Sequence, residues 1–173
     1  MNEDEKNKLE KLRWESERKR KRLELTERLK QLLKSDIFEF LSFEESDKIQ
    51  LQCDDFPSNK WTDSLYFQTE LQNKHNIDNI VKCYTDLNRN DSVFIFFMNF
   101  SVGLVKVLNT TLKNYWADFI DIDGDEIFCY HPNEKDFICI EKTEDVIVGD
   151  ENKNRTWIYE VTFSNEQIKN KLI

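Results

Sequence analysis

Carboxylates are the residues of this chain whose types and spacing come closest to a known kind of chemistry. Four of them lie close together in the last third of the sequence: Asp121, Asp123, Asp125 and Glu126. Alternating Asp residues supply the first ligands of a calcium-binding EF-hand loop, which also needs Gly at its sixth position and Glu at its twelfth. Here Gly124 stands fourth and Pro132 twelfth. We therefore interpret Asp123-Gly124 as the turn of a β-hairpin, with the carboxylates on a solvated or partner-facing edge.

A second carboxylate pattern fits a metal-dependent nuclease only in part. Such an enzyme holds its metal with an acid and a Glu-x-Lys tripeptide on neighbouring strands. Glu151-x-Lys153 supplies the tripeptide, and Asp136 or Asp145 supplies the upstream acid, but the tripeptide falls in a predicted turn. We expect no metal site there, and an enzyme with an unrecognised carboxylate or metal site is the third-ranked alternative.

Histidine and cysteine offer little further chemistry. His131 lies near Cys129 and Cys139, and these side chains could bind zinc only with a fourth ligand that the sequence does not obviously supply. We interpret the two cysteines as small buried apolar residues and His131 as a turn residue. With three glycines in the chain, neither a phosphate-binding loop nor a nucleophile elbow is present. We therefore expect no cofactor, no metal and no catalytic residue.

The distribution of charge divides the chain near residue 34. Residues 1–34 hold 12 Lys/Arg and 8 Asp/Glu, a net of +4; residues 35–173 hold 13 Lys/Arg and 26 Asp/Glu, a net of −13, and the two sum to −9. We expect a basic N-terminal helix over 1–34 and an acidic α+β domain over 35–173. Surfaces of opposite sign attract different partners.

The most concentrated positive charge is the run Arg18-Lys19-Arg20-Lys21-Arg22. This run could contact the phosphates of a nucleic acid. Alternatively it is a solvated helix face, because acidic residues stand about one helical turn away on either side: Glu15, Glu17, Glu24 and Glu27. The acidic domain would repel nucleic acid, so nucleic-acid binding ranks below protein binding.

The N-terminal third predicts one long helix followed by a strand. Residues 3–34 contain no Gly or Pro and are rich in good helix formers. Leu25, Leu29 and Leu32 recur at helical spacing, so we expect this half of the helix to dock on the domain. The stretch Arg13–Arg22 offers only Trp14 as an apolar side chain, and we expect it to be solvated. Ile49–Cys53 alternates apolar and polar residues, which predicts a half-buried strand.

The remaining sequence predicts a sheet with packed helices. Residues 64–72 fit a strand or a helix, 76–87 a helix, 92–100 a central strand covered on both faces, and 102–116 a helix. The last third predicts a β-meander with strands at 119–122, 126–130, 137–140, 146–148 and 156–163. Ser164 is expected to cap a final helix over 165–172. The predicted fold class is α+β: an antiparallel β-meander sheet with packed helices, preceded by a long charged N-terminal helix.

Acidic residues recur in the predicted turns of this domain, where a partner could reach them. The candidate partner-binding set is Asp54, Asp55, Asp121, Asp123, Asp125, Glu126, Asp145, Asp150 and Glu151. A surface of this kind speeds association with a basic protein and can block a phosphate-binding cleft without catalysis. We therefore expect a non-enzymatic acidic module that binds a basic protein partner.

Over residues 36–173 the chain resembles the immunity proteins of bacterial toxin–immunity systems. The similar stretch runs from Trp116-Ala-Asp-Phe through Asp125-Glu126-Ile-Phe to Phe137-Ile-Cys-Ile. The resemblance implies a cognate toxin as the partner, inhibition by steric occlusion, and no enzyme activity. The long basic helix is not part of that pattern. It keeps open a regulatory or adaptor protein that uses the helix for assembly or nucleic-acid binding.

Apolar runs in this sequence are short. The longest is Val93–Met98, which is far below the length needed to cross a bilayer. The first 22 residues are charged throughout and lack the apolar core of a signal peptide. We therefore expect a cytoplasmic protein with no membrane partner and with reduced cysteines.

Overall fold

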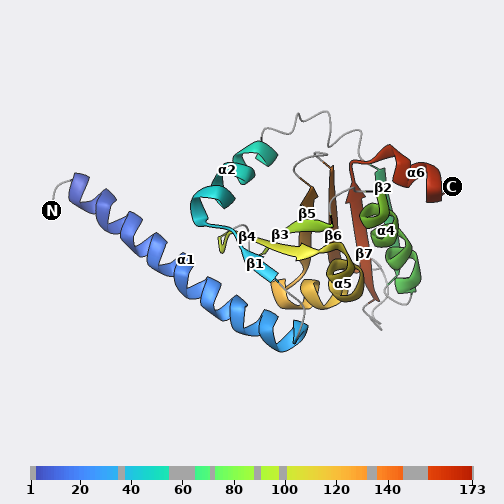
Figure 1. The fold of residues 1–173 in the computed structure, drawn as a ribbon, viewed down its shortest axis with the longest axis horizontal. Coiled ribbons are helices and arrows are strands. Elements are labelled where there is room, and N and C mark those ends of the chain that lie inside the picture. The colour runs from blue at the N-terminus through green and yellow to red at the C-terminus, as the bar shows by residue number, and fades with distance from the viewer. Residues whose placement is uncertain are drawn as a thin grey trace.

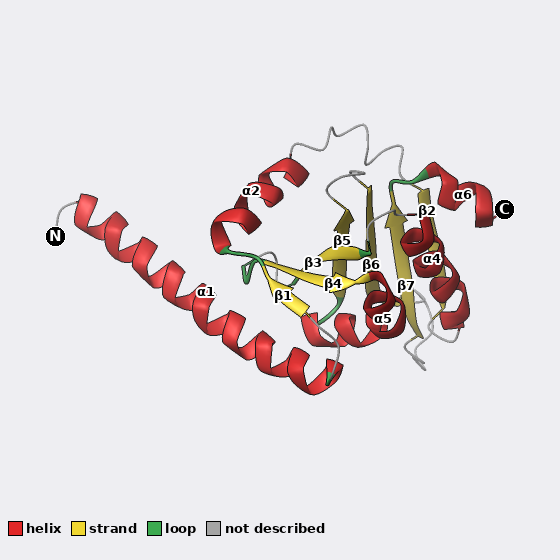
Figure 2. Cartoon of the chain, in the orientation of Figure 1, coloured by secondary structure: helices red, strands yellow, loops and turns green. Residues whose placement is uncertain are grey.

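A computed structural model describes residues 3–34, 38–54, 65–70, 73–87, 91–97, 101–131, 136–145 and 156–172. The α+β fold class is confirmed: a seven-stranded antiparallel sheet carries helices on its faces (Figures 1 and 2). The helices are α1 Glu3–Leu33, α2 Phe43–Asp54, α4 Lys74–Leu87, α5 Asn109–Asp123 and α6 Glu166–Leu172. The strands are β1 Phe38–Phe40, β2 Leu65–Glu70, β3 Ser92–Phe96, β4 Leu104–Leu108, β5 Glu126–His131, β6 Asp136–Asp145 and β7 Thr156–Phe163.

The sheet order is β1-β4-β3-β5-β6-β7-β2, so the first two strands of the chain form its two edges. α4 and α5 cover one face, where their apolar residues join Ile95, Val105 and Val161 in the main core. We call this the helix face. α2 packs on the opposite face at the β3–β4–β5 end, where Cys53 and Ile49 meet a second apolar cluster around Phe128. We call this the open face, because α2 covers only part of it.

α1 is half docked and half exposed. Leu25, Leu29 and Leu33 are fully or almost fully buried in the main core, which confirms the predicted docking of the C-terminal half. Residues 3–16 are exposed throughout, and this part of the helix extends beyond the sheet (Figure 1). The predicted solvation of residues 13–22 is wrong at Arg18, which is buried, and at Arg22, which is partly buried.

Two predictions in the middle of the chain are corrected, the strand at 49–53 and the helix at 102–116. Ile49–Cys53 belongs to α2 rather than to a strand, because a capping box starts a helix just upstream: Ser42 Oγ accepts the Glu45 N–H at 3.1 Å and Glu45 Oε2 accepts the Ser42 N–H at 3.1 Å. The stretch 104–108 is strand β4, paired with β1 and β3, and the helix begins only at Asn109. Val105 and Val107 are buried around an exposed Lys106, so the two-residue period of a strand outweighs the helical spacing there.

The predicted Asp123-Gly124 hairpin is also wrong. Residues 109–123 are helical, and Gly124 ends α5 with φ 121° while its N–H bonds to the Ile120 carbonyl at 2.9 Å. A positive φ at this position suits glycine, which has no Cβ to clash. The strand predicted at 119–122 is therefore the last turns of α5.

The C-terminal third agrees more closely with the sequence. β5, β6 and β7 form a meander, as predicted. Earlier in the chain, the helix predicted at 76–87 is present as α4, and the central strand predicted at 92–100 is present as β3 over Ser92–Phe96. Ser164 is not the cap of the final helix: Asn165 Oδ1 accepts the Gln167 N–H at 2.9 Å, while Ser164 Oγ accepts the Phe137 N–H at 2.9 Å. The strand predicted at 146–148 lies outside the described residues.

Candidate protein-binding surfaces

The acidic residues singled out in the sequence do not form one surface. Asp121 and Asp123 lie at the end of α5, Asp125 precedes β5, and Glu126 begins it. Asp54 and Asp145 are the last residues of α2 and β6. Asp55, Asp150 and Glu151 lie outside the described residues. The expectation that the acidic residues occupy turns is therefore wrong for five of them: Asp54, Asp121 and Asp123 are helical, and Glu126 and Asp145 belong to strands.

Asp121 and Glu126 in particular are separated by the sheet itself. Asp121 pairs with Lys142 at 3.1 Å on the helix face, where Lys142 stands opposite Tyr159. Glu126 is opposite Glu141 and so shares its face. Because neighbouring residues of a strand point to opposite faces, Glu141 and Lys142 lie on different sides of β6.

Three glutamates stand side by side on the open face. Glu126 of β5 is opposite Glu141 of β6, and Glu141 is opposite Glu160 of β7. We call Glu126, Glu141 and Glu160 the glutamate row. Glu126 and Glu141 are exposed and Glu160 is half-buried. Within the part of the chain that the structure describes, no Lys or Arg forms an ion pair with any of the three.

The glutamate row has an unfavourable electrostatic environment. Burial, followed by the charges of Glu126, Glu160 and Asp125, raises the pKa of Glu141 above its ordinary value. Cys139, one row away on the same face, donates its thiol to Glu126 Oε1 at 3.0 Å. Burial and the neighbouring Glu126 raise the pKa of Cys139, so this residue stays a thiol and lends one hydrogen bond to the row.

Sequence reasoning found Glu126 and missed Glu141 and Glu160. Glu160 lies inside the strand predicted at 156–163 and Glu141 directly follows the strand predicted at 137–140, so neither was counted among the acidic residues of predicted turns. Strand alternation was the signal that could have found them. Ile140, Tyr159 and Val161 are buried on the helix face, so the adjacent residues Glu141 and Glu160 point to the opposite face. Their alignment with Glu126 depends on strand register, which no local pattern contains.

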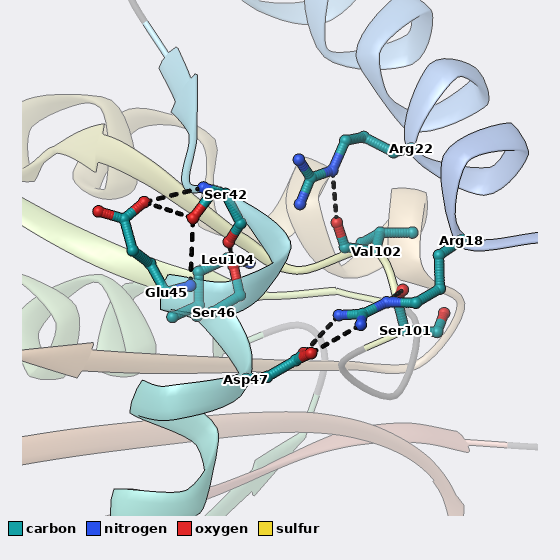
Figure 3. Close-up of polar contacts among 9 residues, drawn as sticks. All are labelled: Arg18, Arg22, Ser42, Glu45, Ser46, Asp47, Ser101, Val102 and Leu104. Carbon is teal, nitrogen blue, oxygen red and sulfur yellow. Dashed lines mark hydrogen bonds and ion pairs between the residues drawn. The ribbon is translucent and has the colours of Figure 1, made fainter. Parts of the chain in front are cut away.

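The basic run of α1 is divided by the helix into an inner and an outer side. Arg18 and Arg22 point toward α2 and the β3–β4 connection (Figure 3). Arg20 is exposed and pairs with Glu17 at 2.6 Å and with Glu24 at 2.5 Å. Lys21 lies 3.9 Å from Glu17. Lys19 is exposed beside a groove between α1 and α2. The predicted patch is therefore not one continuous basic surface.

Arg18 and Arg22 clamp α1 to the domain. Arg18 forms a bidentate ion pair with Asp47 of α2, at 2.8 and 2.5 Å, and its Nε donates to the Ser101 carbonyl at 2.9 Å. Arg22 Nε donates to the Val102 carbonyl at 2.8 Å. Both guanidinium groups lie over the Phe43 ring, at 4.3 and 3.6 Å from its centroid. We call Arg18, Arg22 and Asp47 the arginine clamp.

The clamp leaves no room for a side chain at Gly103. A Cβ at that position would clash with Arg22 Nη2 and lie 2.8 Å from Ser46 Oγ, and Gly103 has φ +81°. Burial and the charge of Arg18 lower the pKa of Arg22 from its ordinary value, while Asp47 opposes that shift. Asp47 is ion-paired with Arg18, Arg22 is bonded to the Val102 carbonyl, and both guanidinium groups lie over the Phe43 ring, which fixes the position of α1.

His131 and Cys129, at the end of β5, have the buried surroundings of structural residues. His131 is the last residue of β5 and is fully buried beside Tyr84, so its interpretation as a turn residue is wrong. Burial lowers the pKa of His131 to about 4, and the nearby backbone of Ser92 partly opposes this shift. Burial also raises the pKa of Cys129. Among the described residues, no group of three or more His, Cys, Asp or Glu side chains is arranged to hold a metal ion.

No protein-family model matches the chain, and no curated protein sequence matches it. Among the helices that the structure describes, none combines the length and apolar character required to span a membrane.

Proposed function

We propose that this chain is a non-enzymatic protein-binding module that presents the glutamate row to a basic surface of a partner. The observation that carries the proposal is the register of the row: three like charges stand directly opposite one another on neighbouring strands. Like charges in such positions destabilise a sheet. A lysine or arginine from a partner would neutralise that repulsion. The relief of repulsion on binding would therefore strengthen the affinity of the chain for a basic partner.

The net charge of the whole chain also favours a basic partner. A net charge of −9 attracts basic proteins at long range and accelerates their association. The resemblance to immunity proteins extends the proposal to a basic toxin or nuclease whose active surface the chain would occlude. The buried, deprotonated state of His131 and the raised thiol pKa values of Cys129 and Cys139 make these groups poor acids, bases and nucleophiles, which favours binding over catalysis.

A regulatory or adaptor protein that acts through α1 is the second candidate. The observation in its favour is the exposed N-terminal part of the helix, which carries Leu12 at 54% and Trp14 at 52% exposure. Arg18 and Arg22 are occupied in the clamp and Arg20 in ion pairs, so α1 favours a protein surface over a nucleic acid as its partner.

The test is capture from nuclease-treated lysate of the source cell by three immobilised forms of the full chain. The first is the unchanged chain, the second is Glu126→Gln/Glu141→Gln/Glu160→Gln, and the third is Glu3→Gln/Glu10→Gln/Glu15→Gln. The second and third forms lose the same charge, but only the second alters the row. Bound proteins are eluted with stepped salt and identified by mass spectrometry.

We expect the unchanged chain and the α1 variant to capture the same basic protein and to release it as salt rises. The row variant should lose it. Equal capture by the row variant would contradict the proposal, and loss confined to the α1 variant would move the function to α1.

A further inference from the structure

The two edge strands of the sheet, β2 and β1, differ in length and in the described elements that lie beside them. β2 pairs with β7 over six residues, from Leu65 opposite Phe163 to Glu70 opposite Ile158, and no described strand pairs with its other side. β1, at the opposite edge, has only three residues and lies against the docked half of α1, where Arg22 covers Phe40. A long open edge strand presents backbone N–H and C=O groups that can pair with an added strand.

A groove runs along this edge between β2 and α4. Its volume is about 680 Å³, and it is lined by Phe67 of β2, by Lys171 of α6, and by one flank of α4: Asn76, Asn79, Ile80, Lys82, Cys83 and Asp86. Phe67 and Cys83 are half-buried and Ile80 is fully buried, so the floor is apolar. Figure 1 places α4 and α6 at the β2 end of the sheet. A strand added to β2 would direct every second side chain into this groove.

The charge at the rim of the groove is positive. Lys82 and Lys171 are exposed and form no ion pair among the described residues. Asp86, the acidic residue of the lining, is already paired with Lys113 of α5. In a chain of net charge −9, this edge is therefore a local exception. A second copy of the chain would bring the same lysines to the same edge, so the charge disfavours self-association there.

We propose that β2 is a strand-addition site for an acidic, extended segment of a partner protein. The segment pairs its backbone with β2, places an apolar side chain against Phe67 and Ile80, and directs carboxylates two residues to either side toward Lys82 and Lys171. This site is distinct from the glutamate row. Phe67 stands opposite Val161 on the helix face, whereas Glu160 points to the open face, and the two sites select partners of opposite charge.

The test uses the full chain and the blocked peptide acetyl-Thr-Glu-Thr-Val-Thr-Glu-Thr-amide, in which valine and both glutamates share one face of an extended strand. Binding is followed by two-dimensional NMR of the labelled protein and by hydrogen exchange. We expect the peptide to shift and protect the β2 amides. Two peptides N-methylated at alternate residues distinguish strand addition from other binding modes. Methylation of the N–H groups that face β2 should abolish binding, whereas methylation of the N–H groups that face away should not affect it.

Two chain variants test the groove itself. Lys82→Glu/Lys171→Glu should weaken peptide binding about threefold to tenfold, the range for two exposed ion pairs. The matched control Lys6→Glu/Lys8→Glu makes the same charge change on exposed α1 residues and should bind like the unchanged chain. Asn79→Trp, at an exposed position of α4, fills the groove and should abolish binding while the protein stays folded by circular dichroism.

The proposal fails if millimolar peptide leaves the β2 amides unshifted, if the two N-methylated peptides bind alike, or if the Lys6/Lys8 control weakens binding as much as the groove variant. It also fails if sedimentation shows a dimer that protects β2 without peptide, since a second copy would then be the occupant. None of these results depends on Glu126, Glu141 or Glu160, so the glutamate row is tested separately.

Discussion

The glutamate row and the two arginines of the arginine clamp are both groups of like charge, but within the described chain only the arginines have an oppositely charged partner and hydrogen bonds to backbone carbonyls. In the clamp, Arg18 is neutralised by Asp47 and both arginines donate to backbone carbonyls beneath an aromatic ring. In the row, three glutamates stand in register with one thiol as their described hydrogen-bond donor. The difference teaches that a charge run in a sequence identifies a surface only after its internal partners are known.

The most conspicuous charge pattern in the sequence is not the accessible charged surface of the folded chain. The run Arg18–Arg22 is the most conspicuous charge pattern in the chain, yet its inward arginines hold α1 in place. The glutamates of the row are scattered over 35 positions, from 126 to 160, and they converge only through the sheet. Arg18 and Arg22 of the basic run thus have a structural role, whereas the glutamate row provides the accessible charge.

The largest effect should come from breaking the clamp. Arg18→Met keeps much of the apolar stem but leaves Asp47 without its cation, and we expect a loss of about 2 kcal/mol of unfolding free energy. Arg20→Met removes an equal charge from exposed ion pairs on the same helix and should leave stability nearly unchanged. Urea unfolding of both variants measures the difference. Equal stabilities would show that the clamp does not hold α1.

A second effect of similar kind should come from Gly103. Gly103→Ala places a Cβ against Arg22 Nη2 and Ser46 Oγ at positive φ, and we expect a cost of about 2 kcal/mol. Gly124→Ala meets no atom within 4 Å, so only backbone strain of about 1 kcal/mol should remain. Thermal unfolding of the pair checks the ranking. A cost at Gly124 that exceeded the cost at Gly103 would remove crowding in the clamp as an explanation.

A smaller effect, of opposite sign, should come from the row. Glu141→Gln removes the central charge, and we expect the free chain to gain roughly 0.5 kcal/mol at neutral pH. The folded state raises the pKa of Glu141, so it binds this proton more tightly than the unfolded state does. The repulsion is therefore absent below the ordinary value of 4.5 and develops as pH rises through the raised pKa.

The pH dependence provides the check on that prediction. The stability difference between Glu141→Gln and the unchanged chain should appear between mildly acidic and neutral pH and should vanish below the ordinary pKa of a glutamate. Chemical unfolding at a series of pH values measures it. A difference that is constant across this range would mean that charge repulsion is not its cause.

Much of the fold follows from local patterns. The alternation of Trp157, Tyr159, Val161 and Phe163 specified β7, and the spacing of Ile77, Ile80 and Tyr84 specified α4. α2 was misread because Ile49, Leu51 and Cys53 alternate over a stretch too short to separate a helix from a strand. The capping-box pair Ser42 and Glu45 was the signal that would have corrected it.

The arginine clamp could be predicted from the sequence in part, and the glutamate row could not. Arg18 and Arg22 continue the helical spacing of Leu25, Leu29 and Leu33, so their inward position was readable from the sequence. Asp47 as their partner was not readable, because it lies on another helix. The row was out of reach for the same reason: its members are brought together by register between strands.

The most direct test of the account measures stability and partner capture on one variant, Glu126→Gln/Glu141→Gln/Glu160→Gln, beside the charge-matched Glu3→Gln/Glu10→Gln/Glu15→Gln. If the row is charge held available for a partner, the first variant should be more stable than the unchanged chain by about 1 kcal/mol and should lose its basic partner. The second should keep both properties. A row variant that still captures the partner, or that loses stability, would contradict the account.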